Sequence, residues 1–376
     1  MPLHVMKPQP SPGQFWAAAV HALRTRRPVL EAGGGSLGVA ALVAAAAILL
    51  GEKQRRKEKE QPRSWYERLV SHPLVAWLIE NSCVVGSTWL GCMVVPAPRR
   101  GSLASILRHI ILGSTLQVWA IMAMQKIVTD GLYSHIPTFT SPGRPKPGLL
   151  QYVKEFCTCN VPVDFVNSLM LGSSIAAYSA KKFQSSFISR SFSPSKFLRA
   201  LAIGRFCVDI GFWAGHRLLH HPKLYFLHRR HHGHHRPALI TNFHFAPLDL
   251  WVEGVMPMVI TLLVLDLLRV GTTRFEANLI VGYLLWHETG SHCGKPLPTV
   301  TFFPPLAPLY QLLLGPVDRD NIRHHDVHHA RLNGNYGITI WPDIVMGTRL
   351  RDHTAPRETH RAEAAEILRF FSRTKQ

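Results

Sequence analysis

The sequence predicts an all-α integral membrane protein in which transmembrane helical hairpins carry a cytosolic, helical, histidine-rich cap that binds metal. Hydrophobic residues make up 47% of the 376 residues and charged residues only 17%. The apolar residues fall in long runs, as they do in membrane proteins. Fifteen of the 22 histidines lie between residues 216 and 329. Clustered imidazoles in such a short stretch indicate metal binding.

The strong positive charge of the chain, formally +19, is compatible with two kinds of partner. Basic residues could bind nucleic acid, but here they flank the apolar runs. In that position they would face anionic lipid headgroups on the cytosolic side of a membrane. We therefore expect a lipid bilayer as a partner and no nucleic acid.

Residues 1–63 form the first predicted segment. The first 30 residues are basic and contain no acid, which suits a cytosolic tail and leaves organelle targeting open. Residues 33–51 are uncharged and long enough for a first membrane helix. The dense charge of residues 52–63 predicts a solvated linker or a juxtamembrane helix.

Residues 64–204 form a predicted membrane-helix region. Its apolar stretches fall at residues 74–97, 103–125, 160–180 and 196–215. Glu80 and Arg108 lie inside two of them and must face other helices or water, because polar groups are costly in lipid. We expect these stretches to pair as helical hairpins.

Residues 205–350 form the predicted histidine-box region, and a polar tail follows at 351–376. If all the histidines serve one centre, they must lie on one side of the membrane. The chain from 235 to 287 then crosses an even number of times or not at all. Residues 248–268 are apolar but contain Pro257, so we expect a kinked or re-entrant helix there, in a shallow hairpin or an interfacial pair rather than two full crossings.

The histidines recur at helical spacing. On an α-helix, positions i, i+3 and i+4 fit within an arc of about 100°. Three sets follow this spacing, which are His216 with His220, His228 with His231 and His232, and His325 with His328 and His329. Imidazoles held this close would repel one another if charged, so a shared cation is the reason to gather them.

Other histidines in the region do not follow these faces. His324 lies about 100° from His325 on the predicted helix, and His234 is likewise off its face. His221 precedes Pro222, which ends the helix. Whether His221, His235 or His244 joins the site stays open.

This pattern resembles the fatty acid hydroxylase/sterol desaturase superfamily, whose integral membrane enzymes carry HxxxH, HxxHH and HxxHH boxes around a di-metal centre. The resemblance covers about residues 205–350. It includes Asp209 before the first box and, after the last, Asn335-Tyr336-Gly337, Asp343 and Gly347-Thr348. By this resemblance His287 and His292 complete the centre. The implied metal ligands are His216, His220, His228, His231, His232, His287, His292, His325, His328 and His329.

His287 and Glu288 also look like the start of the zinc-protease HExxH motif. The second histidine, His292, comes one position too late, and an i, i+5 pair does not share a helix face. The protease interpretation therefore fails. We expect the second ring nitrogens of the metal ligands to have hydrogen-bond partners. The candidates are Asp209, Asp326 and Asn335.

The resemblance implies the chemistry of the superfamily. Two iron ions, with zinc as an alternative in the isolated protein, would use O2 and two electrons to hydroxylate or desaturate a membrane lipid. Electrons would come from NAD(P)H through a reductase and a small acidic b-type cytochrome. This chain has no visible flavin or cytochrome motif, and its basic surface suits an acidic donor. The implied location is the endoplasmic reticulum membrane. Sterols and fatty acyl chains are both compatible with the architecture.

Two alternatives belong to other functional classes. One is a histidine-rich metal carrier, which would bind many ions weakly. Carriers usually place their histidines in irregular loops, whereas the histidines of this chain keep helical register. A non-catalytic relative would keep the fold without turnover. The complete set of boxes favours the enzyme.

Overall fold

The computed structural model describes residues 64–94, 103–139, 144–167, 193–270, 272–314 and 318–350, and every regular element within them is helical. The all-α prediction is confirmed for this part of the chain. The predicted features at residues 33–51, 52–63 and 351–376 lie outside the described residues, as does most of the apolar stretch at 160–180.

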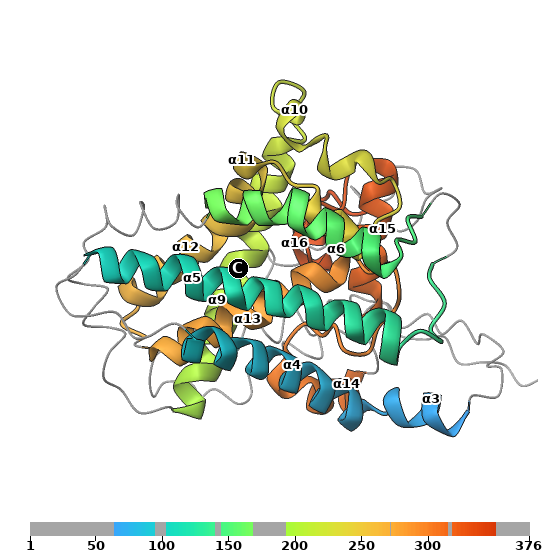
Figure 1. The fold of residues 1–376 in the computed structure, drawn as a ribbon, viewed down its shortest axis with the longest axis horizontal. Helices are drawn as coiled ribbons and strands as arrows, with labels where there is room; N and C mark the ends of the chain where they lie inside the picture. Colours follow the sequence, from blue (N-terminus) through green and yellow to red (C-terminus); the bar gives the residue numbers. More distant parts are fainter. Residues whose placement is uncertain are drawn as a thin grey trace, which may run out of the picture.

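The helices carry the labels of Figure 1. They are α3 (Trp65–Val70), α4 (Pro73–Val94), α5 (Leu103–Lys126), α6 (Leu149–Glu155), α9 (Pro194–Leu219), α10 (Tyr225–His228), α11 (Pro247–Leu250), α12 (Met256–Leu267), α13 (Arg274–Ser291), α14 (Ala307–Leu314), α15 (Arg319–Arg331) and α16 (Ile340–Val345). Turns of π-helix occur at Ile127–Leu132, Phe156–Asn160 and Trp251–Val255, and 3₁₀ turns at His231–Gly233, Leu239–Phe243 and Pro304–Leu306.

Helices α4 and α5 pack side by side and cover one side of α13 (Figure 1). Gly91 of α4 permits the close approach, because an added Cβ would lie 2.9 Å from the carbonyl oxygen of Gly113. Gln117 of α5 joins all three helices. Its side-chain amide donates to the Thr88 hydroxyl at 3.0 Å and to the Asn278 carbonyl at 2.7 Å.

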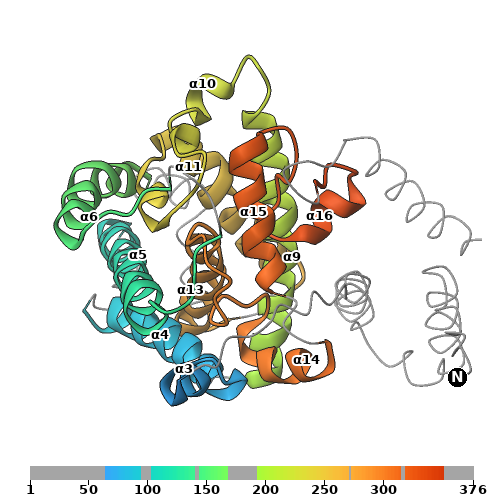
Figure 2. The ribbon, with the colours of Figure 1, turned by 90° about the vertical axis from the view of Figure 1, so that its right-hand side faces the viewer.

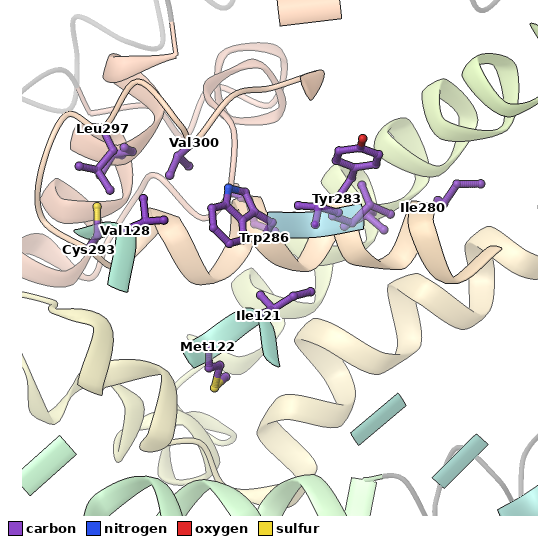
Figure 3. Packing of buried hydrophobic residues seen from close by; sticks show 14 of the residues in the cluster. Ile121, Met122, Val128, Ile280, Tyr283, Trp286, Cys293, Leu297 and Val300 are labelled. Atoms are coloured by element: carbon purple, nitrogen blue, oxygen red, sulfur yellow. The ribbon is translucent and has the colours of Figure 1, made fainter. Parts of the chain in front are cut away.

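Helix α13 runs through the middle of the fold and supplies the centre of the apolar core (Figures 2 and 3). Trp286 and Tyr283 are buried there, close to Ile121 of α5 and to Val300. The Trp286 indole N–H donates to the Thr299 carbonyl at 2.7 Å. These contacts fix the end of α13 that leads into the histidine cluster.

Helix α9 packs closely on the helical run formed by α11, a π-helical turn and α12. At Gly211 an added Cβ would lie 3.1 Å from the Pro257 side chain, and at Gly215 only 2.8 Å from the Val252 carbonyl oxygen. Two glycines therefore allow the backbones to approach where larger residues would separate them. This contact positions the end of α9 that carries the first histidine box.

The same run, Pro247–Leu267, is the one helix among the described residues that is long and apolar enough to cross a membrane, judged by length and composition. Ile260, Leu263 and Leu267 are exposed on it. The π-helical turn at Trp251–Val255 interrupts its regular geometry near the expected kink. The hairpin arrangement of the other apolar stretches stays a prediction.

Helix α15 carries the last histidine box and packs against α13 and α16, and Figure 2 shows it in front of α9. It ends at Arg331, and Leu332 follows in a left-handed conformation with φ 60°. This turn reverses the chain, so the segment after α15 returns toward the histidines. The first and last boxes thus meet, although about a hundred residues separate them in the chain.

Candidate metal centre

The first histidine box occupies the end of α9. His216 lies in the last turn, and His220 caps the helix with its backbone N–H bonded to the His216 carbonyl at 3.1 Å. The two imidazole centroids are 5.0 Å apart. Both rings therefore lie on one face, as the spacing predicts.

The second box is not one helix, and the prediction of a single helical face there is wrong. Tyr225–His228 forms a short helix, and His231–Gly233 forms a 3₁₀ turn. Gly233 and the nearby Pro237 leave too few residues to propagate an α-helix. A 3₁₀ turn rotates successive side chains further than an α-helix does. His231 and His232 consequently point toward different sites.

The last box keeps the predicted helical register on α15. His325, His328 and His329 point into the cluster, while His324 turns away and its Nε2 contacts the Asp343 carboxylate at 2.9 Å. These three inward histidines are spread over a wide arc of the helix surface. One helix can therefore supply ligands to two adjacent sites.

The histidines form two groups in which the candidate ligand nitrogens lie within 4.8 Å of one another. Site A consists of His216, His220, His228, His232 and His328. Site B consists of His231, His292, His325 and His329. The sites adjoin, because the rings of His232 and His329 have centroids 4.6 Å apart. Each site draws on several segments of the chain.

The spacing of the nitrogens fits a bound cation. In site A the Nε2 of His232 lies 3.1 Å from that of His220 and 3.2 Å from that of His328. In site B the Nε2 of His292 lies 2.9 Å from that of His325. Two nitrogens that bind one metal at 2.0–2.1 Å are about 2.9–3.4 Å apart for usual bond angles.

Backbone carbonyl oxygens fix the tautomer of several ligands. The Nδ1 of His216 contacts the Tyr336 carbonyl at 2.8 Å, and that of His328 contacts the Gly334 carbonyl at 2.7 Å. A carbonyl only accepts, so these Nδ1 atoms carry the hydrogen. Each Nε2 then directs a lone pair into the site, which is the form that binds a metal.

Several ring nitrogens in the two sites are buried and lack a hydrogen-bond partner among the described residues. These nitrogens are Nε2 of His216, His228 and His329, and Nδ1 of His231, His232 and His325. Buried polar atoms without a partner are costly. A cation bonded to the inward-facing nitrogens would remove the cost for the Nε2 atoms. The donor set therefore fits two metal ions.

Burial favours the neutral form of most of these imidazoles. Burial, and after it the neighbouring histidines, lowers the pKa of His231, His232, His325 and His329 well below the usual value. Burial lowers the pKa of His292 and His328 to about 3. Neutral imidazole is the ligand form, so the cluster could bind a metal without first losing protons.

Two carboxylates on the apolar run adjoin site A. His228 Nδ1 lies 2.8 Å from Asp249 Oδ1 and 3.1 Å from Glu253 Oε1. Glu253 Oε1 is also 3.9 Å from His216 Nε2. A carboxylate on the second nitrogen of a metal-binding histidine fixes the ring and raises its basicity. The helix that could cross a membrane thus begins against site A.

The structure does not bring His287 into either site. Its Nδ1 contacts the Arg205 guanidinium at 3.1 Å, whereas His292 joins site B. The reason is the i, i+5 spacing at the end of α13, which points the two rings about 140° apart.

The predicted partners of the ring nitrogens lie elsewhere. Asp209 pairs with Arg205 at 2.8 Å and accepts from the Thr339 hydroxyl. Asp326 pairs with Arg144 at 2.6 Å. Asn335 donates its amide to backbone carbonyls.

The partners of the second ring nitrogens are instead Asp249, Glu253 and the backbone carbonyls of residues 334 and 336. An acid inside the apolar run, Glu253, was the sequence signal for the carboxylates. Backbone carbonyls give no sequence signal.

Residues 201–348 match the family described as "Fatty acid hydroxylase". This match contains all the histidines of sites A and B. The histidine-box region belongs to the fatty acid hydroxylase/sterol desaturase superfamily. No solved structure is significantly similar to the chain.

Curated members of the superfamily share this region at moderate identity. "Fatty acid hydroxylase domain-containing protein 2" of Homo sapiens is 31% identical over 154 residues, which cover 40% of this chain and 39% of that protein. "Fatty acid hydroxylase ahd1" of Mycosarcoma maydis is 26% identical over 256 residues, 62% of this chain and 57% of that protein. "Methylsterol monooxygenase 1" of Rattus norvegicus is 28% identical over 140 residues, 37% of this chain and 42% of that protein. The chain thus spans about two fifths of the length of the human relative.

Proposed function

We propose that the protein is a membrane-bound, non-haem di-iron oxidoreductase that uses O2 and two electrons to hydroxylate or desaturate a lipid of the sterol or fatty acyl type. The observation that carries this proposal is the pair of adjacent, buried, all-histidine sites A and B. Membership of the superfamily, which includes proteins named as a fatty acid hydroxylase and a methylsterol monooxygenase, supports it.

In this proposal each site holds one metal ion through inward-facing ring nitrogens. Imidazole donors suit iron, zinc and copper alike. Bound iron would activate O2 by reduction, which attack on an unactivated C–H bond requires. The protein contributes neutral ligands of fixed tautomer and a buried site that limits access of water.

The apolar run Pro247–Leu267 supports a lipid substrate. Its outer part exposes aliphatic side chains such as Leu263 and Leu267. Its first turns carry Asp249 and Glu253 against His228 of site A. A lipid chain lying along this run would approach site A from the bilayer.

The surface around α10 suits an acidic electron donor. Figure 1 shows α10 at a projecting end of the fold. Four basic side chains in this stretch are exposed, which are Arg217, Lys223, Arg229 and Arg230. The chain has no acid between residues 209 and 249. We propose that a small acidic b-type cytochrome, reduced by NAD(P)H through a reductase, docks here by charge complementarity. The docking face would lie on the cytosolic side of the endoplasmic reticulum membrane.

Oxygen uptake tests the proposal. The purified protein is reconstituted in lipid bilayers with iron, NAD(P)H, a cytochrome and its reductase. O2 consumption and lipid products are then measured together. The proposal expects hydroxylated or unsaturated lipid to form with O2 uptake, and expects both to disappear in His328→Ala.

The matched control is His221→Ala, which changes an exposed histidine whose Nδ1 accepts from the Lys223 backbone N–H. It should keep wild-type activity. Metal-loaded protein that consumes no O2 with any lipid offered, while remaining folded, would contradict the oxygenase and favour a non-catalytic relative. Lipids of a host that lacks and then regains the gene would indicate which compounds to offer.

A further inference from the structure

Asp343 of α16 is a fully buried carboxylate that accepts hydrogen bonds from several segments. Its Oδ1 accepts from the Trp213 indole of α9 at 3.2 Å and from the Thr348 hydroxyl at 2.5 Å. Its Oδ2 contacts Nε2 of His324 on α15 at 2.9 Å. One carboxylate therefore connects α9, which carries the first histidine box, with α15, which carries the last.

A single peptide group connects Asp343 to His216 of site A. The Gly337 N–H donates to Asp343 Oδ2 at 2.6 Å. The carbonyl of the same peptide, that of Tyr336, contacts His216 Nδ1 at 2.8 Å. A peptide that is bonded at both ends is polarised, so the carboxylate strengthens the acceptor that holds the imidazole N–H.

A second path leads to His328 of site A. The Gly334 carbonyl contacts His328 Nδ1 at 2.7 Å. In the same peptide, the Asn335 N–H donates to the Thr348 carbonyl at 2.9 Å. The hydroxyl of Thr348 donates to Asp343. The two ligands come from different helices, but one short loop holds both.

The backbone of this loop is adapted to the carboxylate. A Cβ at Gly337 would lie 2.5 Å from the Thr339 carbonyl oxygen and 2.9 Å from Asp343 Oδ2, so a larger residue does not fit between this backbone and the carboxylate. Asn335 has φ 58°, a left-handed conformation that asparagine tolerates better than most residues. The Tyr336 N–H also donates to Asp343 Oδ1 at 2.8 Å.

The carboxylate is charged although it is buried. Burial alone would raise the pKa of Asp343. Hydrogen bonds from His324, Thr348 and Gly337 outweigh burial and hold the pKa below its usual value. The charged form of the carboxylate is thereby favoured one peptide away from a site A histidine.

We propose that Asp343 is a positioning residue for site A. It holds the loop of residues 334–337 so that two carbonyl oxygens fix the N–H tautomers of His216 and His328. In site B the corresponding Nδ1 contacts come from other carbonyls, that of His234 for His329 and that of Glu288 for His292. The influence of Asp343 is thus selective for one of two metals. This inference rests on the metal centre of the proposed function.

The test compares metal retention by full-length protein and the Asp343→Asn variant. Asparagine keeps the shape but loses the charge and presents an amide N–H2 to a group of donors. Both proteins are loaded with Co²⁺, and transfer to a chelator is followed by the ligand-field absorption of the bound ion. The variant should bind one of its two ions about 10- to 100-fold more weakly, with a changed absorption for that ion, and should retain the other.

The matched control is Asp318→Asn. Asp318 is also buried, but it accepts from the Phe302 N–H and the Tyr310 hydroxyl rather than from the loop of residues 334–337. It should keep both ions at wild-type affinity. Unchanged retention of both ions by Asp343→Asn, or equal weakening of both, would overturn the inference.

If the proposed two-metal centre itself is wrong, the wild-type protein will hold fewer than two ions, which distinguishes this outcome from a wrong role for Asp343. If Asp343→Asn does not fold, Thr348→Val decides the question. It removes one donor to Asp343 and keeps the Thr348 carbonyl. A smaller weakening confined to one ion supports the inference, and unchanged retention overturns it.

Discussion

His324 and His325 are neighbours on α15 with different partners. His325 Nε2 lies 2.9 Å from His292 Nε2 in site B, whereas His324 Nε2 contacts the Asp343 carboxylate. We predict that His325→Ala abolishes turnover and removes one metal ion, because it takes a nitrogen directly from site B. His324→Ala should keep most activity, because it removes one of the donors to Asp343 and no nitrogen of either site.

Turnover and metal content, compared at equal amounts of folded protein, check this prediction. An inactive His324→Ala together with an active His325→Ala would show that the register of α15 is wrong.

At the level of residues, helical spacing was enough to predict which side chains of α15 point inward. It was not enough to divide them between two sites. His328 joins site A while its neighbour His329 joins site B, and that division depends on packing against α9 and α13. His287 shows the same limit: its i, i+5 spacing from His292 points the two rings apart, but only the structure shows that His287 contacts Arg205 and His292 joins site B.

At the level of elements, the long helices could be predicted because each has an apolar stretch long enough to propagate. The second histidine box could not. It is rich in histidine and arginine and has no apolar face of its own, so its conformation depends on the surrounding fold. Its 3₁₀ turn places His231 in site B and His232 in site A.

The close contact between α9 and the π-helical turn at Trp251–Val255 leaves no room for a larger residue at Gly215. In Gly215→Ala, the new methyl group would lie 2.8 Å from the Val252 carbonyl oxygen and 3.0 Å from its side chain. Overpacking of this kind costs about 1–3 kcal/mol. We expect a lower thermal midpoint of the protein in detergent.

The control is Gly86→Ala on α4, where an added Cβ meets no atom within 4 Å. Alanine favours a helix more than glycine does, so the midpoint should stay equal or rise. Equal midpoints for the two variants would mean that α9 and this turn are not tightly packed.

For the whole molecule, the sequence predicts that all histidine boxes lie on one side of a membrane. The two sites take ligands from α9, α13 and α15 and from the segment between residues 228 and 232, so these parts share one compartment. We predict that a tag inserted near His235 and a tag after Arg351 are both cytosolic. Protease protection of tagged protein in sealed microsomes checks this. Protection of either tag would contradict a single centre reduced from the cytosol.

The proposed function requires that sites A and B each bind one metal ion. Elemental analysis of the purified protein in detergent tests it most directly, combined with one variant in each site. We predict two ions per wild-type chain, iron in the active form, and about one ion in either His328→Ala or His231→Ala, which belong to sites A and B. Two ions retained in both variants, with the protein folded, would contradict it.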